Sequence, residues 1–202
     1  MKIELNIDKN IFNEAYLSFL DCKKRYQVFY GGAGSGKSVF VAQREILKFF
    51  EGGHNTLIVR KTAKSNRNST YALIKQILNS WNIPAKWYKI NKSEMTITNT
   101  VNGSQIAFAG LDDVEKLKSV TFENGILTDV WIEEASEVSE SDFNQLDLRL
   151  RGFAPVPFTI TMTFNPIDAN FWAKARFFDR VNSNCSVCKT TYLDNRFIDD
   201  QY

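Results

Sequence analysis

The sequence has little cysteine and histidine, which limits the metal and redox chemistry open to it. Three cysteines in 202 residues are too few for a disulfide framework. Cys185 and Cys188 have the spacing of half a zinc or redox site, but no second cysteine pair accompanies them. The one histidine, His54, lies far away along the chain. We therefore expect Cys185 and Cys188 to be buried thiols without a metal.

Long apolar runs are absent as well. No segment is apolar over the length needed to cross a bilayer, and the first 16 residues mix charged and apolar side chains instead of forming the core of a secretion signal. Hydrophobic residues make up 44% of the chain and charged residues 24%, which is ordinary globular usage. These features predict a cytoplasmic protein with no membrane partner and a single domain over residues 1–202.

Acidic residues are missing from one long stretch, Gly52 to Ser93. Since the whole chain has a net charge of +2 and this stretch carries eight basic residues, the rest of the chain carries −6. The eight are Arg60, Lys61, Lys64, Arg67, Lys75, Lys86, Lys89 and Lys92. Such asymmetry is typical of a surface that binds a phosphate-rich polymer, although a merely solvated face would have the same composition.

Strand and helix patterns alternate along the chain. Buried strands are expected at 26–30, 56–60, 126–132, 158–162 and 187–192, and helices at 37–50, 70–81, 142–150 and 170–178. Between 87 and 110 the pattern changes to strict alternation, with Asn102-Gly103 as a hairpin turn. The predicted fold class is α/β: a mostly parallel sheet with helices on both faces and an antiparallel hairpin insertion around 87–110.

One segment matches the phosphate-loop pattern G-x-x-x-x-G-K-[ST] and lies between the first expected strand and the first expected helix. Its residues are Gly31, Gly32, Ala33, Gly34, Ser35, Gly36, Lys37 and Ser38. The glycines let successive backbone N–H groups point at phosphate oxygens, at the positive end of the helix dipole. Lys37 is expected to reach the β and γ phosphates of ATP, and the Ser38 hydroxyl to bind Mg²⁺. A dinucleotide fingerprint is excluded, because Lys37 stands where its third glycine would be.

Two adjacent carboxylates end the strand Val130 to Glu134. Because neighbouring residues of a strand point in opposite directions, Glu133 can face Mg²⁺ while Glu134 faces the γ-phosphate and polarises an attacking water. The second acid favours hydrolysis over phosphoryl transfer to a small molecule. Asp129, on the same face of the strand as Glu133, is the rival magnesium ligand.

A polar residue, Asn165, follows the strand that ends in Thr161-Met162-Thr163-Phe164. At the carboxyl edge of the sheet it is expected to sense the γ-phosphate or the water, although Asn-Pro is also an ordinary turn starter.

Six segments in a fixed order, GGAGSGKS, IVRKTAKSNRNSTY, WIEEASEV, LRLRG, TFNP and TTYLDN, resemble the ATPase domain of phage terminase large subunits. The resemblance spans Tyr30 to Asn195. It implies a P-loop NTPase fold of the additional-strand, catalytic-glutamate type, with the phosphate-loop strand near the middle of the sheet. It also implies a homo-oligomeric ring around double-stranded DNA that uses ATP hydrolysis to fill a procapsid in the host bacterial cytoplasm. The implied protein partners are the portal protein and the small terminase subunit.

The same resemblance assigns roles to individual residues. It implies that Lys37 and Ser38 are the phosphate and metal ligands, that Glu133 is the metal-side acid, and that Glu134 is the catalytic glutamate. It also implies that Asn165 ends the coupling motif and that Arg60 lies near the nucleotide or the DNA. Motors of this kind need an arginine that neutralises the transferred phosphoryl group. Arg149 and Arg151 are the candidates, or else they cap the C-terminal end of the helix at 142–150.

Family members also carry a nuclease domain of ribonuclease-H type, which we do not expect within these 202 residues. We therefore expect neither DNA cleavage nor fast ATP turnover from this chain alone. Two other classes of protein fit the phosphate loop: another nucleic-acid translocase or helicase-like ATPase, and a P-loop kinase or nucleotide switch.

Overall fold

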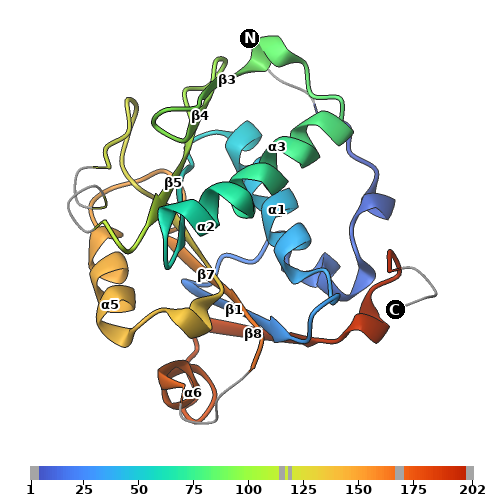
Figure 1. Ribbon diagram of the computed structural model, residues 1–202, viewed down its shortest axis with the longest axis vertical. Coiled ribbons are helices and arrows are strands. Elements are labelled where there is room, and N and C mark those ends of the chain that lie inside the picture. Colours follow the sequence, from blue (N-terminus) through green and yellow to red (C-terminus); the bar gives the residue numbers. More distant parts are fainter. Residues whose placement is uncertain (1–4, 114–116, 118–119, 167–170, 199–202) are drawn as a thin grey trace.

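The computed structural model describes residues 5–113, 117, 120–166 and 171–198. Eight strands of the described residues form one sheet in the order β3-β4-β5-β2-β6-β7-β1-β8 (Figure 1). Only β4 runs against the others, because it pairs antiparallel with both β3 and β5 while the remaining neighbours pair in parallel. The strands are β1 (Tyr26–Gly31), β2 (Asn55–Arg60), β3 (Tyr88–Asn91), β4 (Thr96–Asn99), β5 (Gln105–Gly110), β6 (Asp129–Glu133), β7 (Thr159–Phe164) and β8 (Cys185–Thr190).

Helices cover both faces of this sheet, as the sequence predicts. The α-helices are α1 (Lys37–Glu51), α2 (Ala63–Asn68), α3 (Thr70–Ser80), α5 (Glu140–Arg149) and α6 (Trp172–Phe177). Short 3₁₀ helices are η1 (Lys9–Ile11), η2 (Glu14–Phe19), η3 (Ala85–Trp87), η4 (Ala135–Glu137) and η5 (Tyr192–Asp194). Figure 1 shows α1 and α3 together on one side of the sheet and α5 with α6 away from them. No helix of the described residues has the length and apolar character that a membrane crossing requires.

Alternation along the buried strands explains why the core has two layers. Phe29 and Trp131 pack with the residues of α1 and α3, whereas their neighbours Val28 and Ile132 pack with the residues of α5 and α6. Successive side chains of a strand point to opposite faces, so each central strand contributes to both layers. The same rule separates Cys188 from Cys185. The two thiols are three residues apart on β8 and belong to different layers, which confirms buried thiols and excludes one shared metal ion.

Most element boundaries agree with the sequence prediction, and the largest shifts concern β6 and β8. Strand β6 begins at Asp129 instead of 126, because the carbonyls of Asn124 and Ile126 accept hydrogen bonds from the Asn55 side chain before the ladder begins. Strand β8 ends at Thr190, where η5 follows. Part of the predicted helix at 170–178 lies outside the described residues.

The predicted antiparallel insertion at 87–110 is confirmed. β4 pairs antiparallel with β5 across the predicted Asn102-Gly103 turn, and β3 pairs antiparallel with β4. β5 also pairs in parallel with β2, which joins the insertion to the main sheet. One short helix, α2, was absent from the prediction. It is polar, without apolar periodicity, and the Thr62 side chain caps it by accepting from the N–H of Ser65.

The expectation that the phosphate-loop strand lies near the middle of the sheet is wrong. β1 has β7 on one side and the edge strand β8 on the other. The hairpin β3–β4 widens the sheet at the far edge, while β8 alone extends it beyond β1. Strand β7 separates β1 from β6, which is the additional-strand arrangement that the resemblance implies.

Candidate nucleotide site

The phosphate loop connects β1 to α1 at the carboxyl edge of the sheet. Helix α1 begins at Lys37, and the residue before it, Gly36, has a φ of 81°, a left-handed conformation that glycine adopts without steric cost. At a helix N-terminus the free backbone N–H groups and the helix dipole both favour an anion. The local backbone therefore suits a phosphate group.

The Lys37 side chain is held at the mouth of this loop. Its Nζ donates to the carbonyl oxygens of Gly31 and Gly32, each at 3.0 Å, and to Oδ1 of Asn165 at 2.7 Å. Burial lowers the pKa of Lys37, and the nearby carboxylates of Glu134 and Glu133 act against that shift. Strands β1, β6 and β7 thus bring together the ammonium, both predicted acids and Asn165.

Glu133 joins the phosphate loop to β6. Its Oε1 accepts a hydrogen bond of 2.7 Å from Ser38 Oγ, and its Oε2 accepts one from Thr163 Oγ1 on β7. Trp131 Nε1 donates to the same threonine hydroxyl at 2.8 Å and orients it. Burial raises the pKa of Glu133, and the hydrogen bonds from Thr163 and Ser38 oppose this. A hydroxyl and a carboxylate that meet in this way are ligands suited to Mg²⁺.

Asp129 lies at the other end of β6, away from the phosphate loop. Its carboxylate is 1% exposed and binds Lys48 Nζ and His54 Nδ1, each at 2.7 Å. Burial acts to raise the pKa of Asp129, but the Lys48 ammonium and the His54 hydrogen bond outweigh it and hold this pKa well below its usual range. Four residues of a strand span about 13 Å, so Asp129 is not the rival of Glu133 at the metal position.

Glu134 follows β6 in an unusual backbone conformation. Its φ is 54° and its ψ is 53°, in the left-handed region that non-glycine residues rarely occupy. The chain turns there into η4. Such strain costs on the order of 1–3 kcal/mol and is concentrated at functional positions in proteins. The turn separates the side chain of Glu134 from the strand alternation and leaves it half-buried beside Lys37.

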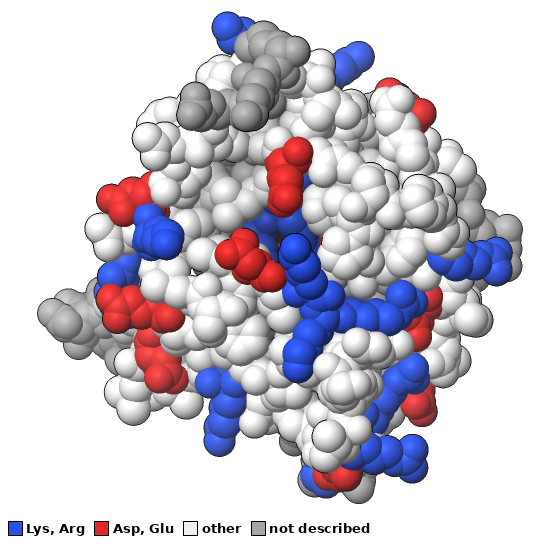
Figure 2. Space-filling view, turned by 180° about the vertical axis from the view of Figure 1, so that it is seen from behind, with Lys and Arg blue, Asp and Glu red and all other residues white. Residues whose placement is uncertain are grey.

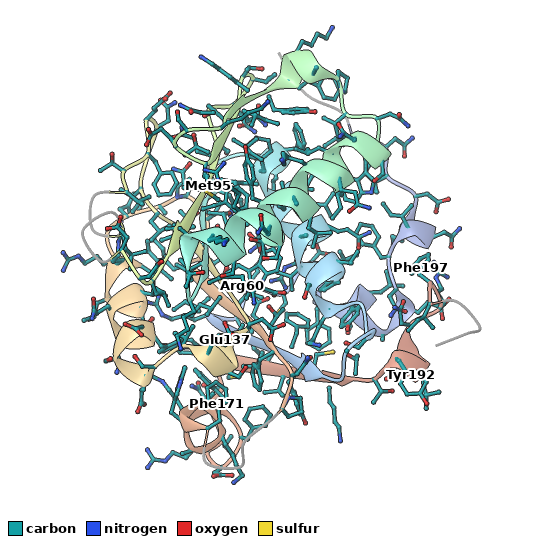
Figure 3. The ribbon with its side chains drawn as sticks, viewed as in Figure 1. Arg60, Met95, Glu137, Phe171, Tyr192 and Phe197 are labelled. Atoms are coloured by element: carbon teal, nitrogen blue, oxygen red, sulfur yellow. The ribbon has the colours of Figure 1, made fainter. Side chains whose placement is uncertain are left out.

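Arg60 ends β2 next to the carboxylates. Its guanidinium donates to Ser69 Oγ at 3.2 Å and lies 3.9 Å from the Glu137 carboxylate (Figure 3). Its charge also acts on Glu133, lowering the pKa of that acid against the larger effect of burial. Arg60 is thus near the acidic side of the site. Its contacts run from there to Ser69, where α2 meets α3.

Neither candidate for the arginine finger contacts the phosphate loop within the part of the chain that the structure describes. Arg149, in the last turn of α5, donates to the backbone carbonyls of Leu117 and Val120. Arg151 is exposed after the helix. Arg149 therefore binds backbone carbonyls at 117 and 120, and the alternative in which the two arginines cap the C-terminal end of the helix stays a prediction.

Three residues of the site were not predicted from the sequence. Thr163 orients Glu133, while Tyr16 and Asn195 bind carbonyls of the phosphate loop from outside it. Thr163 could have been predicted, because it lies two residues before Asn165, and residues two apart on a strand point to the same face of the sheet. The two loop contacts join residues up to 161 positions apart in the sequence, and no local pattern announces them.

A family model and a curated relative both match this chain to the same protein family. A family model described as phage terminase large subunit matches residues 23–202. The PBSX phage terminase large subunit of Bacillus subtilis (strain 168) is 31% identical over 161 residues, covering 77% of this chain and 34% of that protein. The chain thus spans about a third of the length of this relative.

Solved structures share the fold. The large terminase from a thermophilic bacteriophage superimposes with a TM-score of 0.75 at 19% identity, over 94% of this chain and 48% of that chain. The same terminase in complex with ATP-gamma-S gives a TM-score of 0.72 at 17% identity, over 94% and 47% of the two chains. At these identities the likeness extends to the fold alone.

Proposed function

Because the chain belongs to the phage terminase large subunit family, we propose that it hydrolyses ATP with Mg²⁺ to drive double-stranded DNA into a procapsid. The observation that carries this proposal is the meeting of Ser38 with Glu133 at 2.7 Å. It joins the helix that follows the phosphate loop to the acidic strand end, so a triphosphate on the loop lies within reach of the carboxylates. In phosphate-loop NTPases a serine or threonine of the loop and an acid at a strand end together hold the Mg²⁺ of the bound nucleotide.

The residues present fit nucleotide and metal. The Lys37 ammonium is placed to exchange its hydrogen bonds with protein oxygens for bonds with phosphate oxygens, and Ser38 with Glu133 would hold Mg²⁺. When bound, Mg²⁺ neutralises charge on the phosphate oxygens. The terminase of the thermophilic bacteriophage, solved with ATP-gamma-S, supports an adenosine triphosphate as the ligand.

Glu134 is the proposed general base. In hydrolysis a water oxygen bonds to the γ-phosphorus while the bond between that phosphorus and the β–γ bridging oxygen breaks. The carboxylate of Glu134 orients the water and accepts its proton. Lys37, placed between the loop and this carboxylate, stabilises the charge that develops on the phosphate oxygens.

The basic stretch from Gly52 to Ser93 supports DNA as the polymer that the motor moves. Six of its eight basic residues are exposed, on α2, on β3 and in the connections around them: Lys61, Lys64, Arg67, Lys86, Lys89 and Lys92. Helices α2 and α3 face the viewer in Figure 1. The opposite face carries acidic side chains and also a run of Lys and Arg side chains near its centre (Figure 2). We propose that duplex DNA contacts the α2 side, and that the portal protein, the small subunit and further copies in a ring complete the motor.

Phosphate release measured with and without blunt-ended duplex DNA tests the proposal. Wild type should release phosphate from ATP without a second acceptor, faster with DNA, and leave the strands paired. Lys37→Ala should lower the rate by about 10²-fold or more, because a buried electrostatic partner of the phosphates is lost. Release that needs a small-molecule acceptor and ignores DNA would indicate a kinase, and strand separation would indicate a helicase.

A further inference from the structure

Two carbonyl groups of the phosphate loop are held by side chains from outside it. Tyr16 Oη donates to the carbonyl of Ser35 at 2.9 Å, and Asn195 Nδ2 donates to the carbonyl of Gly34 at 2.7 Å. In a planar trans peptide the N–H points away from the C=O. Fixing the Gly34 carbonyl therefore fixes the N–H of Ser35, and fixing the Ser35 carbonyl fixes the N–H of Gly36. These are amides of the loop that is built to face phosphate.

Tyr16 is a rigid support for its hydrogen bond. The side chain is fully buried, and its ring stacks on Phe40 with centroids 4.7 Å apart. Its hydroxyl also lies 2.7 Å from Thr190 Oγ1. A phenol has one proton to give, and since the Ser35 carbonyl can only accept, Thr190 must be the donor in the second bond. Thr190 thereby keeps the Tyr16 proton directed at the loop.

Thr190 also limits the start of the loop through its backbone. It is the partner of Gly31 in the β1–β8 ladder, and a Cβ on Gly31 would lie 1.7 Å from the Thr190 carbonyl oxygen. Only glycine fits there. Thr190 thus has two effects on the loop. Its carbonyl restricts position 31, at the end of β1, to glycine, and its hydroxyl orients Tyr16.

Asn195 is oriented by its own segment. Its Oδ1 accepts from the N–H of Phe197 at 3.1 Å, which leaves Nδ2 directed at the Gly34 carbonyl. Arg196 donates to the Phe12 carbonyl at 3.1 Å and pairs with Glu14 at 3.2 Å, so the two ends of the described chain lie together. Tyr192 and Phe197 mark this corner in Figure 3.

We propose that Tyr16 and Asn195 are positioning residues for phosphate binding, and that Thr190 acts through Tyr16. They hold two loop amides in the direction that phosphate requires before the nucleotide arrives, so that less ordering is needed on binding. This rests on the proposed nucleotide function. Because the loop holds phosphate in the ground state and in the transition state alike, losing either residue raises KM and leaves kcat unchanged.

Titration of ATP-gamma-S into Tyr16→Phe tests the proposal, since this change removes one hydroxyl and keeps the packed ring. The Kd should rise about fivefold, as expected for one hydrogen bond, with a matching rise in the KM for ATP and kcat within about twofold of wild type. Thr190→Val should raise Kd by a similar factor, the double variant should be no worse than Tyr16→Phe alone, and Thr190→Ser should restore affinity.

Tyr71→Phe is the matched control. Tyr71 is also buried, but its hydroxyl has no hydrogen-bond partner within the part of the chain that the structure describes, so its removal should leave Kd unchanged. Wild-type binding with an unaltered Kd in Tyr16→Phe overturns the proposal, whereas no binding by wild type overturns the nucleotide function itself. If thermal unfolding shows that Tyr16→Phe is not folded, Asn195→Ala, at a half-buried position, decides by the same Kd criterion.

Discussion

At the scale of single residues, the site contains two adjacent acids with different surroundings. Glu133 is tied by hydrogen bonds to Ser38 and Thr163, whereas Glu134 turns out of the strand at a φ of 54° beside Lys37. The first is suited to a fixed ligand role. The second is half-buried beside Lys37, a position that suits its proposed role of orienting a water molecule. Of these two neighbours in the sequence, Glu133 is thus the proposed metal ligand and Glu134 the proposed general base.

Glu134→Gln should keep nucleotide affinity and lower kcat by about 10²- to 10⁴-fold, because the amide cannot accept the proton from water. Single-turnover phosphate release and ATP-gamma-S binding measure the two quantities separately. Glu140→Gln, the same change at an exposed glutamate that starts α5, should alter neither. If Glu134→Gln turns over ATP like wild type, Glu134 is not the general base.

The sequence identified the residues expected to bind phosphate and metal, but it did not identify the residues that hold the phosphate loop in place. Lys37 and Ser38 were identifiable because a strand, a glycine-rich turn and a helix start follow one another locally. Glu133 was identifiable because it ends a buried strand with a second acid beside it. The contact of Asn195 with the loop could not be identified, because β8 had first to be placed beside β1. The open alternative at Asp129 was settled by strand direction, which puts it at the opposite end of β6 from Glu133.

At the scale of elements, α2 is the helix that the sequence did not predict, and it carries Lys64 and Arg67 of the proposed DNA contact. Asn66, fully buried, donates to the carbonyls of Ile58 on β2 and Ala109 on β5, at 2.9 and 2.7 Å. The helix is thereby fixed above the carboxyl ends of these strands, close to Arg60. Sequence periodicity misses such a helix because polar hydrogen bonds to the sheet, rather than an apolar stripe, hold it in place.

Charge reversal on α2 should weaken DNA binding without sequence preference. In Lys64→Glu/Arg67→Glu, the slope of log K against log salt should become shallower by about 2, since each phosphate contact contributes about 0.9. Fluorescence anisotropy with duplex DNA at several salt concentrations measures the slope. Lys174→Glu/Arg180→Glu changes the net charge equally on and beside α6, and it should bind as wild type does. Equal slopes for the two double variants would rule out α2 as a DNA contact.

At the scale of the whole molecule, a buried charged network ties both halves of the sheet to α1. Asp129 on β6 binds Lys48 of α1 and His54 before β2, and Thr159 of β7 donates to it at 2.6 Å. Breaking a buried ion pair by removing one charge leaves the other unpaired in a low-dielectric interior. The network therefore bears on global stability, at the far end of the sheet from the nucleotide site.

Asp129→Asn should lower the free energy of unfolding by about 3–5 kcal/mol near neutral pH. Because the folded-state pKa of Asp129 is depressed, its contribution is fully present above the unfolded value, about 3.9, and is lost as pH falls through the folded value. Urea unfolding at pH 7 and at pH 3 should therefore show a smaller gap between wild type and variant in acid. Asp179→Asn, in the exposed pair with Lys174 at 2.8 Å, should cost less than about 1 kcal/mol. A gap that widens in acid would contradict the assignment.

The strand β8 finally provides two natural probes. Its thiols at Cys185 and Cys188 lie in opposite layers, and burial raises both pKa values, that of Cys188 to about 11. Alkylation of either thiol therefore waits for its own layer to open. Cys188 thus reports on the α1 side of the sheet and Cys185 on the α5 side. Comparing the two alkylation rates with and without nucleotide would show which layer opens more readily in each state.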